Sequence, residues 1–115
     1  MVASLLPWTP DRGDLIWLDF DPQAGHEQAG RRPGLVLSPA LYNARRGLAL
    51  CCPITSRAKG YPFEVALPAG LPVGGVVLAD QVRSLDWQAR HAALIGRLPA
   101  SELTLVLAKL RQLVT

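Results

Sequence analysis

The chain has 115 residues and a mass of 12.4 kDa, which allows one hydrophobic core and excludes a second domain with its own core. Apolar residues make up 50% of the chain and charged residues 18%, a balance that excludes a disordered chain. The formal net charge of +3 is too small to identify a partner, and ten glycines and ten prolines predict many turns rather than a helical bundle. We expect a single domain over residues 1–115, with residues 1–11 as an N-terminal extension.

The first predicted element is a strand from Gly13 to Phe20. Ile16, Leu18 and Phe20 share one face of this strand, and the opposite face is mixed, so the pattern predicts a half-buried strand. Residues 21–32 then form a polar loop with one proline and two glycines. This loop is longer than most connections between elements, and such loops in small domains often carry function.

The middle of the chain contains several short segments separated by turn residues. In chain order, we expect strands over 33–38 and 47–54 joined by a segment with one helical turn (39–46), a polar loop (55–61), a strand at 63–67, a Pro- and Gly-rich hinge (68–75), a strand at 76–83, a short helix over 84–90 capped by Ser84, and a strand at 92–98.

The last segment, residues 101–114, is the clearest helix, with Ser101 as its expected N-cap. Its apolar residues recur at helical spacing and form one stripe: Leu103, Val106, Leu107, Leu110, Leu113 and Val114. We expect this stripe mainly to pack on a sheet; contact with a second copy of the chain is the less favoured interpretation. The predicted fold is mainly β, of the α+β class: a small, strongly curved antiparallel sheet or SH3-like barrel of five to seven strands with a C-terminal helix.

Several features argue against membrane, secreted and metal-binding proteins. Residues 1–12 lack a basic region followed by an apolar run, so we expect no signal peptide. The most apolar stretch, residues 65–79, is interrupted by prolines and glycines and is not expected to span a membrane. Cys51 and Cys52 are neighbours that point to opposite faces of a strand, so we expect two buried free thiols in a reducing cytoplasm. Two separated histidines without a Cys-x-x-Cys pair predict no metal site.

The charges are distributed unevenly along the chain. Residues 31–60 carry six basic side chains and no acidic one, whereas residues 1–30 carry five acidic side chains and one basic. This asymmetry indicates a local anion-binding surface. The alternative is that the two segments lie side by side and neutralise each other.

Pairing of the strands at 33–38 and 47–54 predicts where a site would form. If they are antiparallel around a turn at residues 43–44, facing positions have numbers that sum to about 87, which places Arg32 opposite Thr55. Both residues would then lie at the sheet end where the two polar loops emerge. A register slip of one residue would turn either side chain to the other face.

Five sequence blocks occur in a recognisable order. They are GDLIWLDFDP (13–22) with GHEQAGRRP (25–33), LSP (37–39) with YN (42–43), CPIT (52–55), KGYPFE (59–64) and LADQV (78–82). In this order the blocks closely resemble the MazF/PemK family of toxin endoribonucleases, and the match runs from about residue 10 to the C-terminal helix. The chain departs from the family pattern at Arg31, which we expect to alter sequence preference, and in the hinge at 68–75, which we expect to change a surface loop.

The resemblance implies a homodimeric, barrel-like, cytoplasmic enzyme that cuts single-stranded RNA at short sequences without metal or cofactor. It also implies a separate MazE-like antitoxin that holds the enzyme inactive. Carried over residue by residue, it implies Arg32, Thr55 and Glu27 as catalytic residues. The RNA-binding residues that we expect beside them come from the two polar loops and one strand end: Gln28, Gly30, Arg31, Ser56, Arg57, Lys59, Asp80 and Gln81.

The chemistry of metal-free RNA cleavage suits these residue types. The neighbouring 2′-hydroxyl attacks phosphorus, and the products carry a 2′,3′-cyclic phosphate and a 5′-hydroxyl. The Arg32 guanidinium suits the phosphoryl oxygens because it offers forked donors and stays charged, and the Thr55 hydroxyl can bond the same oxygens. For the base we prefer Glu27, with His26 as the alternative because imidazole titrates near neutral pH; the general acid is left open.

Each candidate also has a purely structural interpretation. Arg32 could pair with Glu27 or Asp19 on the surface, and Thr55 at a strand end is commonly a turn hydroxyl. Asp80 and Gln81 would ordinarily be polar groups at the end of a strand.

The remaining aromatic and histidine side chains are expected to be structural. Trp17 and Trp87 are expected in the core or an interface, and His91 is expected to be structural.

The same fold also suits a non-enzymatic toxin of the CcdB type or a nucleic-acid-binding barrel, both of which would bind their partners without catalytic turnover.

Overall fold

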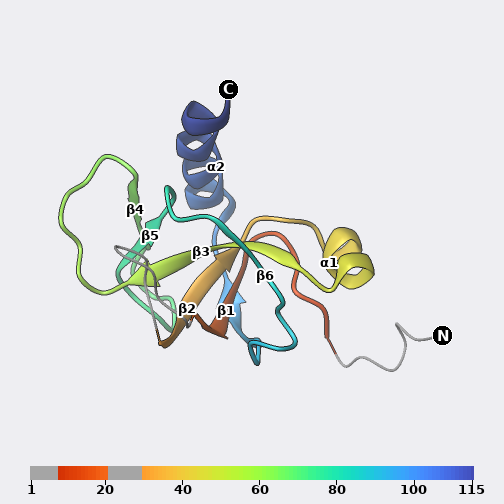
Figure 1. The fold of residues 1–115 in the computed structure, drawn as a ribbon. Helices are drawn as coiled ribbons and strands as arrows, with labels where there is room; N and C mark the ends of the chain where they lie inside the picture. The colour runs from red at the N-terminus through yellow and green to blue at the C-terminus, as the bar shows by residue number, and fades with distance from the viewer. Residues whose placement is uncertain (1–7, 21–29) are drawn as a thin grey trace.

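The structure is a computed structural model that describes residues 8–20 and 30–115. Three residues of the predicted site region, His26, Glu27 and Gln28, lie outside the described residues. The elements of the described part are β1 (Asp14–Asp19), β2 (Arg31–Val36), α1 (Ala40–Arg46), β3 (Ala49–Thr55), β4 (Glu64–Ala66), β5 (Val76–Leu78), β6 (Arg83–Leu85), β7 (Ala93–Arg97) and α2 (Ala100–Val114), as Figure 1 shows.

The strands form one seven-stranded antiparallel sheet in the order β4-β5-β3-β2-β1-β7, with β6 paired to β3 beside this path. The strand β3 holds the sheet together, because it pairs with β2, β5 and β6. Within the described residues the sheet stays open, with β4 and β7 at its two ends. The predicted curved antiparallel sheet with a C-terminal helix is therefore confirmed.

Both faces of the sheet are covered, which explains why β1 is more buried than its alternation predicts. Ile16 and Leu18 belong to a core cluster that includes Trp87, whereas Leu15 belongs to a second cluster that includes Val106 of α2. Trp87 is thus a core residue, as expected, while Trp17 is 37% exposed. The mixed outer face predicted for β1 is wrong at Leu15, because the C-terminal helix covers that part of the sheet.

The helix α2 packs on the sheet through its first three turns only. Its predicted apolar stripe contacts the core at Leu103, Val106, Leu107 and Leu110. The last two members, Leu113 and Val114, are 49% and 71% exposed, and the C-terminal end of the helix projects away from the sheet (Figure 1). Among the described residues, no helix is long and apolar enough to cross a bilayer.

The two cysteines point to opposite faces of β3, as predicted. Cys51 lies in one core cluster and Cys52 in the other, and both are free thiols. Burial raises the pKa of each thiol to about 12. Both therefore remain protonated at neutral pH and are poor nucleophiles.

Two predicted helix features are wrong. Ser84 does not cap a helix over 84–90 but lies in β6, where it pairs with Leu50, because the strand ladder outweighs the local capping signal. The predicted strand at 76–83 is correspondingly split by a turn between β5 and β6. Helix α2 begins one residue early: Pro99 occupies the N-cap position, and the Ser101 hydroxyl instead donates to the Glu102 carboxylate at 2.6 Å.

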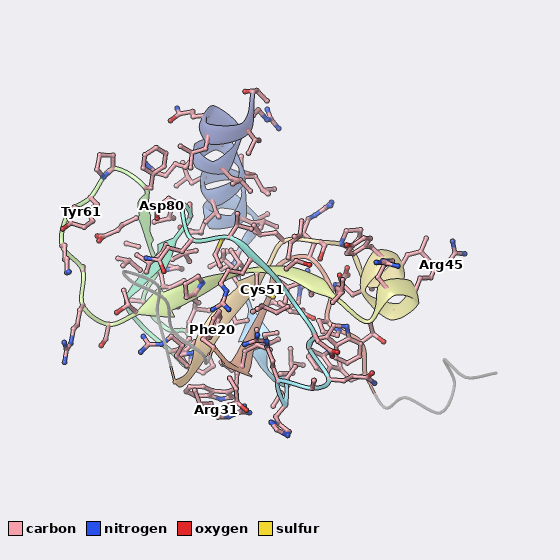
Figure 2. The ribbon with its side chains drawn as sticks, viewed as in Figure 1. Phe20, Arg31, Arg45, Cys51, Tyr61 and Asp80 are labelled. Atoms are coloured by element: carbon pink, nitrogen blue, oxygen red, sulfur yellow. The ribbon has the colours of Figure 1, made fainter. Side chains whose placement is uncertain are left out.

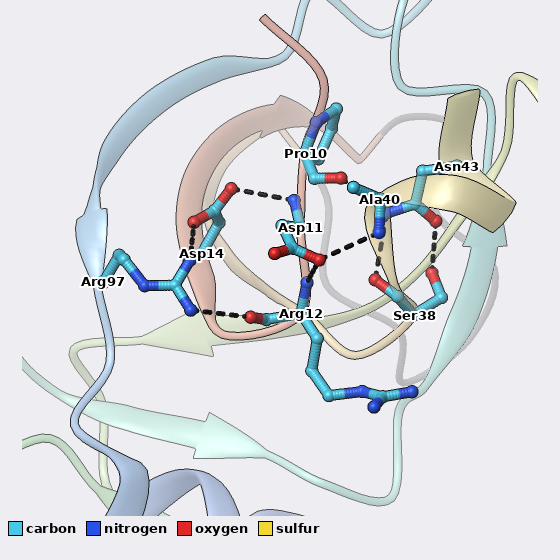
Figure 3. Close-up of polar contacts among 8 residues, drawn as sticks. All are labelled: Pro10, Asp11, Arg12, Asp14, Ser38, Ala40, Asn43 and Arg97. Atoms are coloured by element: carbon cyan, nitrogen blue, oxygen red, sulfur yellow. Dashed lines mark hydrogen bonds and ion pairs between the residues drawn. The ribbon is translucent and has the colours of Figure 1, made fainter.

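A polar network ties the N-terminal stretch to α1 and β7 (Figure 3). Asp14, only 4% exposed, forms an ion pair with Arg97 at 2.6 Å and accepts the backbone N–H of Asp11. The Asp11 carboxylate accepts the N–H of Ala40 at 2.9 Å, which is the first residue of α1. No side chain caps α1 locally at Pro39, so a carboxylate 29 residues away stabilises the helix start instead.

Replacement of Asp11 by alanine is expected to cost about 1–2 kcal/mol at pH 7, the size of a charged helix-capping contact. Hydrogen bonds from the N–H groups of Ala40 and Arg12 lower the pKa of the Asp11 carboxyl in the folded protein. The carboxylate therefore stabilises the fold above its unfolded pKa of about 3.9, and this stabilisation is lost as pH falls through the folded value. Urea unfolding of the wild type and of Asp11→Ala at pH 7 and pH 3 measures this contribution. The difference in the free energy of unfolding between the two proteins should be smaller at pH 3. An equal difference at both pH values would show that the charge of Asp11 is not its source.

Candidate active site

The β2–β3 register agrees with the predicted register. Gly34 pairs with Pro53, Leu35 with Cys52 and Val36 with Cys51, so facing residue numbers sum to 87. Beyond the Gly34–Pro53 pair, the strands lead to Arg32 and Thr55. Both residues line one cavity of about 490 Å³, together with Ser56, Arg57 and Lys59. The predicted meeting of Arg32 with Thr55 at this end of the sheet is therefore confirmed.

Thr55 is held firmly at the end of β3. It is 7% exposed and pairs with Val76 of β5. Its Oγ1 accepts the N–H of Arg57 at 3.2 Å, so the Thr55 hydroxyl does stabilise the turn after β3, as its structural interpretation predicts. A hydroxyl that accepts a hydrogen bond still has its own proton to donate, so the same contact leaves Thr55 able to donate within the cavity.

A second cavity of about 340 Å³ adjoins the first and shares Thr55, Arg57 and Lys59 with it. Its other lining residues come from the loop before β4, the start of β4, the end of β5 and the turn after β5: Tyr61, Phe63, Glu64, Leu78, Asp80 and Gln81. Asp80 and Gln81 are thus brought to the site, as predicted. The labelled Tyr61 and Asp80 lie on the same side of the molecule in Figure 2, away from α1.

A third cavity of about 340 Å³ shares Arg32 and Ser56 with the first and adds Arg31. It is also lined by Val73 and Gly74 from the hinge at 68–75. The next residue, Gly75, has a φ of +113°, and a Cβ there would lie 2.2 Å from the Thr55 carbonyl oxygen. The hinge thus passes directly behind the site, which its composition alone does not reveal.

Arg31 is held at the start of β2 by a small ion-pair cluster. It contacts Asp19 at 3.1 Å and donates to the His91 carbonyl at 2.8 Å. His91 in turn contacts the other Asp19 oxygen through Nδ1 at 2.8 Å. Hydrogen bonds from His91 and then Arg31 lower the pKa of the Asp19 carboxyl. This arrangement gives His91 the expected structural role and makes Asp19 the partner of Arg31.

The basic segment 31–60 divides between two places. Four of its six basic side chains (Arg31, Arg32, Arg57 and Lys59) line the three cavities. The other two lie in the last turn of α1, and the labelled Arg45 is on the opposite side of the molecule from Tyr61 (Figure 2). Four of the six cations are therefore gathered around the three cavities, and within the described residues Arg31 forms an ion pair with Asp19 of the acidic segment.

Several cavity-lining residues, among them Tyr61, Phe63 and Glu64, are not among the predicted site residues. Tyr61, Phe63 and Glu64 line the second cavity, and all three lie in the KGYPFE block. That block was the signal that could have identified them. Among the residues that the structure describes, no group of three or more His, Cys, Asp or Glu side chains is placed to hold a metal ion.

Comparison with known proteins places the chain in one family. Residues 11–114 match the family described as PemK-like, MazF-like toxin of type II toxin-antitoxin system. The chain is 53% identical over 107 residues to the endoribonuclease toxin MazF of Escherichia coli K12, an alignment that covers 93% of this chain and 96% of that protein. It is 62% identical to the crystal structure of MazF from Deinococcus radiodurans, with a TM-score of 0.91 and coverage of 93% and 97%.

A chain of the MazE-MazF crystal structure from Deinococcus radiodurans is also similar, at 55% identity and a TM-score of 0.83, with coverage of 93% of this chain and 96% of that one. The family match spans nearly the whole sequence and includes every described residue of the three cavities. The chain therefore belongs to the family of PemK-like, MazF-like toxins of type II toxin-antitoxin systems.

Proposed function

We propose that this toxin is a metal-independent endoribonuclease that cleaves single-stranded mRNA at short sequences and so arrests translation. Family membership and relatives named endoribonucleases support RNA cleavage. The observation on this chain that carries the proposal is the meeting of Arg32 and Thr55 at one cavity lined by three further polar or basic side chains. A guanidinium and a hydroxyl in one cavity can both donate hydrogen bonds to the phosphoryl oxygens of a phosphodiester. These bonds stabilise the negative charge that develops there in the transition state.

The proposed reaction needs no group outside the protein and the RNA. The 2′-oxygen attacks the adjacent phosphorus and loses its proton to Glu27, or to His26 in the alternative assignment. The bond from phosphorus to the 5′-oxygen breaks, and this oxygen takes up a proton, which leaves a 2′,3′-cyclic phosphate and a 5′-hydroxyl. Arg32 stabilises the charge on the phosphoryl oxygens, and Thr55 donates a hydrogen bond to the same oxygens.

The proposed RNA path follows the three adjoining cavities. Arg31, Ser56, Arg57 and Lys59 would contact phosphates, while Asp80 and Gln81 offer acceptors and donors to bases. Gln28 and Gly30, in the segment that leads to β2, complete the proposed set.

The proposed partners are a second copy of the chain, a MazE-like antitoxin and RNA, all in the cytoplasm. The exposed apolar side chains of α2, Leu105, Leu113 and Val114, support a homodimer. An acidic antitoxin would dock on the basic cavities and compete with RNA.

The decisive experiment incubates the purified protein with a long single-stranded RNA in excess EDTA. We expect cleavage at a short recurring sequence, read by primer extension, with 2′,3′-cyclic phosphate ends on the upstream fragments. A strict requirement for a divalent metal would contradict the proposal. Salt-sensitive binding without turnover would instead indicate a nucleic-acid-binding barrel, with log K falling by about 0.7 per neutralised phosphate per log unit of salt.

A further inference from the structure

We propose that Glu64 is a positioning residue for RNA binding, whose carboxylate holds the loop over residues 57–63 in the shape that presents Lys59 and Tyr61 to the RNA. This inference rests on the proposed endoribonuclease function and assigns a role within it. Glu64 is the first residue of β4 and lines the second cavity with both of these side chains.

The carboxylate of Glu64 organises the loop through main-chain contacts. It accepts the N–H of Lys59 at 3.1 and 3.2 Å from its two oxygens and the N–H of Gly60 at 3.0 Å. The backbone N–H of Glu64 donates to the Tyr61 carbonyl at 3.1 Å. Gly60 has a φ of +77°, which lets the chain turn so that consecutive N–H groups point at one carboxylate.

The base of the loop is attached to a neighbouring strand and to the C-terminal helix. Glu64 pairs with Leu78 of β5, and the N–H of Ala79 donates to the Phe63 carbonyl at 3.0 Å. From the other side, the Lys109 ammonium of α2 donates to the Pro62 carbonyl. The loop is thus connected both to the turn that carries Asp80 and to the C-terminal helix.

The consequence for the site is a fixed position for two exposed side chains. The Lys59 ammonium lies 5.9 Å from the centre of the Tyr61 ring, within cation–π range. Tyr61 is 60% exposed, so it offers a flat surface on which a base can stack beside a phosphate-binding cation. A loop that already has this shape needs less ordering when RNA binds.

The contacts of Glu64 predict an effect on binding rather than on chemistry. Its described partners are N–H groups of an exposed loop, which water can satisfy when the carboxylate is removed. Loss of Glu64 should therefore loosen the loop and leave the sheet intact. Arg32 lies at the start of β2 and Thr55 at the end of β3, outside the loop that Glu64 holds.

The test compares Glu64→Ala and Glu64→Gln with Glu102→Ala as the matched control, since Glu102 lies in the first turn of α2 outside the cavities. Steady-state cleavage of a short RNA over a substrate concentration series separates KM from kcat. We expect Glu64→Ala to raise KM about tenfold, as for loss of a preorganised hydrogen-bonded loop, and to leave kcat nearly unchanged. Glu64→Gln, which keeps one acceptor oxygen, should be intermediate, and Glu102→Ala should match the wild type.

Amide hydrogen exchange gives a second readout that does not need catalysis. Exchange across residues 57–63 should be faster in Glu64→Ala than in the wild type or Glu102→Ala. Lys109→Met, which removes the bond to Pro62, should also accelerate it. Unchanged exchange together with unchanged KM overturns the inference, and so does a fall in kcat at constant KM, which would make Glu64 part of the chemistry.

Failure of the proposed function is distinguishable from failure of this inference. If the wild type does not cut RNA, the proposed function falls. Binding of an all-2′-deoxy oligonucleotide, which lacks the nucleophile, then measures the role of the loop directly. Weaker binding by Glu64→Ala than by Glu102→Ala supports the positioning role, and equal binding overturns it.

Discussion

Replacement of Arg32 by alanine is expected to lower the rate of RNA cleavage about 10²–10³-fold, as removal of one donor to the developing charge does in other enzymes. Arg32 is half-buried at the start of β2 and shares a cavity with Thr55. The adjacent guanidinium of Arg31 is not expected to replace it, because Arg31 is held by Asp19 and the His91 carbonyl. The measurement is single-turnover cleavage of a short RNA at saturating concentration.

The matched control for this prediction is Arg45→Ala. It removes the same charge from α1, on the other side of the molecule from Tyr61 (Figure 2). Both variants should unfold at the wild-type urea concentration, and the Arg32 variant should still bind uncleavable RNA. Arg32→Lys should recover only part of the rate, because a lysine cannot bind two phosphoryl oxygens as a planar fork. Full activity of Arg32→Ala would remove Arg32 from the reaction.

The second large effect is expected from Gly75→Ala, which should lower the free energy of unfolding by about 2–4 kcal/mol. The added Cβ would lie 2.2 Å from the carbonyl oxygen of Thr55 and 3.0 Å from the Cα of Ser56. These are backbone atoms, which cannot rotate away as a side chain would. The φ of +113° at Gly75 is also strained for any residue with a Cβ.

Cleavage should fall together with stability in this variant, because Thr55 and Ser56 both line the Arg32 cavity. Urea unfolding measures stability, and single-turnover cleavage at a temperature where the variant remains folded measures the site. Gly74→Ala is the neighbouring control, since a Cβ at Gly74 would meet no heavy atom within 4 Å among the described residues outside its two chain neighbours. Equal stability of the two alanine variants would show that Gly75 does not pack tightly against the backbone of Thr55.

Much of the site could be predicted because its geometry follows from short-range regularities. The β2–β3 register depends on the length of one connection, and it correctly paired the Arg32 end of β2 with the Thr55 end of β3. The opposite faces of Cys51 and Cys52 follow from the alternation of a strand. The KGYPFE block was recognised, but the role of Glu64 was not, because sequence order does not show which N–H groups a carboxylate accepts.

Local signals failed where a distant segment supplied a stronger contact. Ser84 has the chemistry of a helix cap, yet the ladder with β3 makes it part of a strand. Leu15 stands on the predicted outer face of its strand, yet α2 buries it from the far end of the chain.

The sequence by itself determined the antiparallel sheet, the C-terminal helix, the β2–β3 register and the family, because periodicity, turn length and ordered motifs are properties of neighbouring residues. Only the tertiary structure decided that Gly75 passes behind Thr55 and that Glu64 gathers the N–H groups of its own loop. It also decided that Asp11 stabilises the start of α1. The contacts of Gly75 and Asp11 join groups 20 and 29 positions apart, and their existence depends on the packing of whole elements rather than on any local pattern.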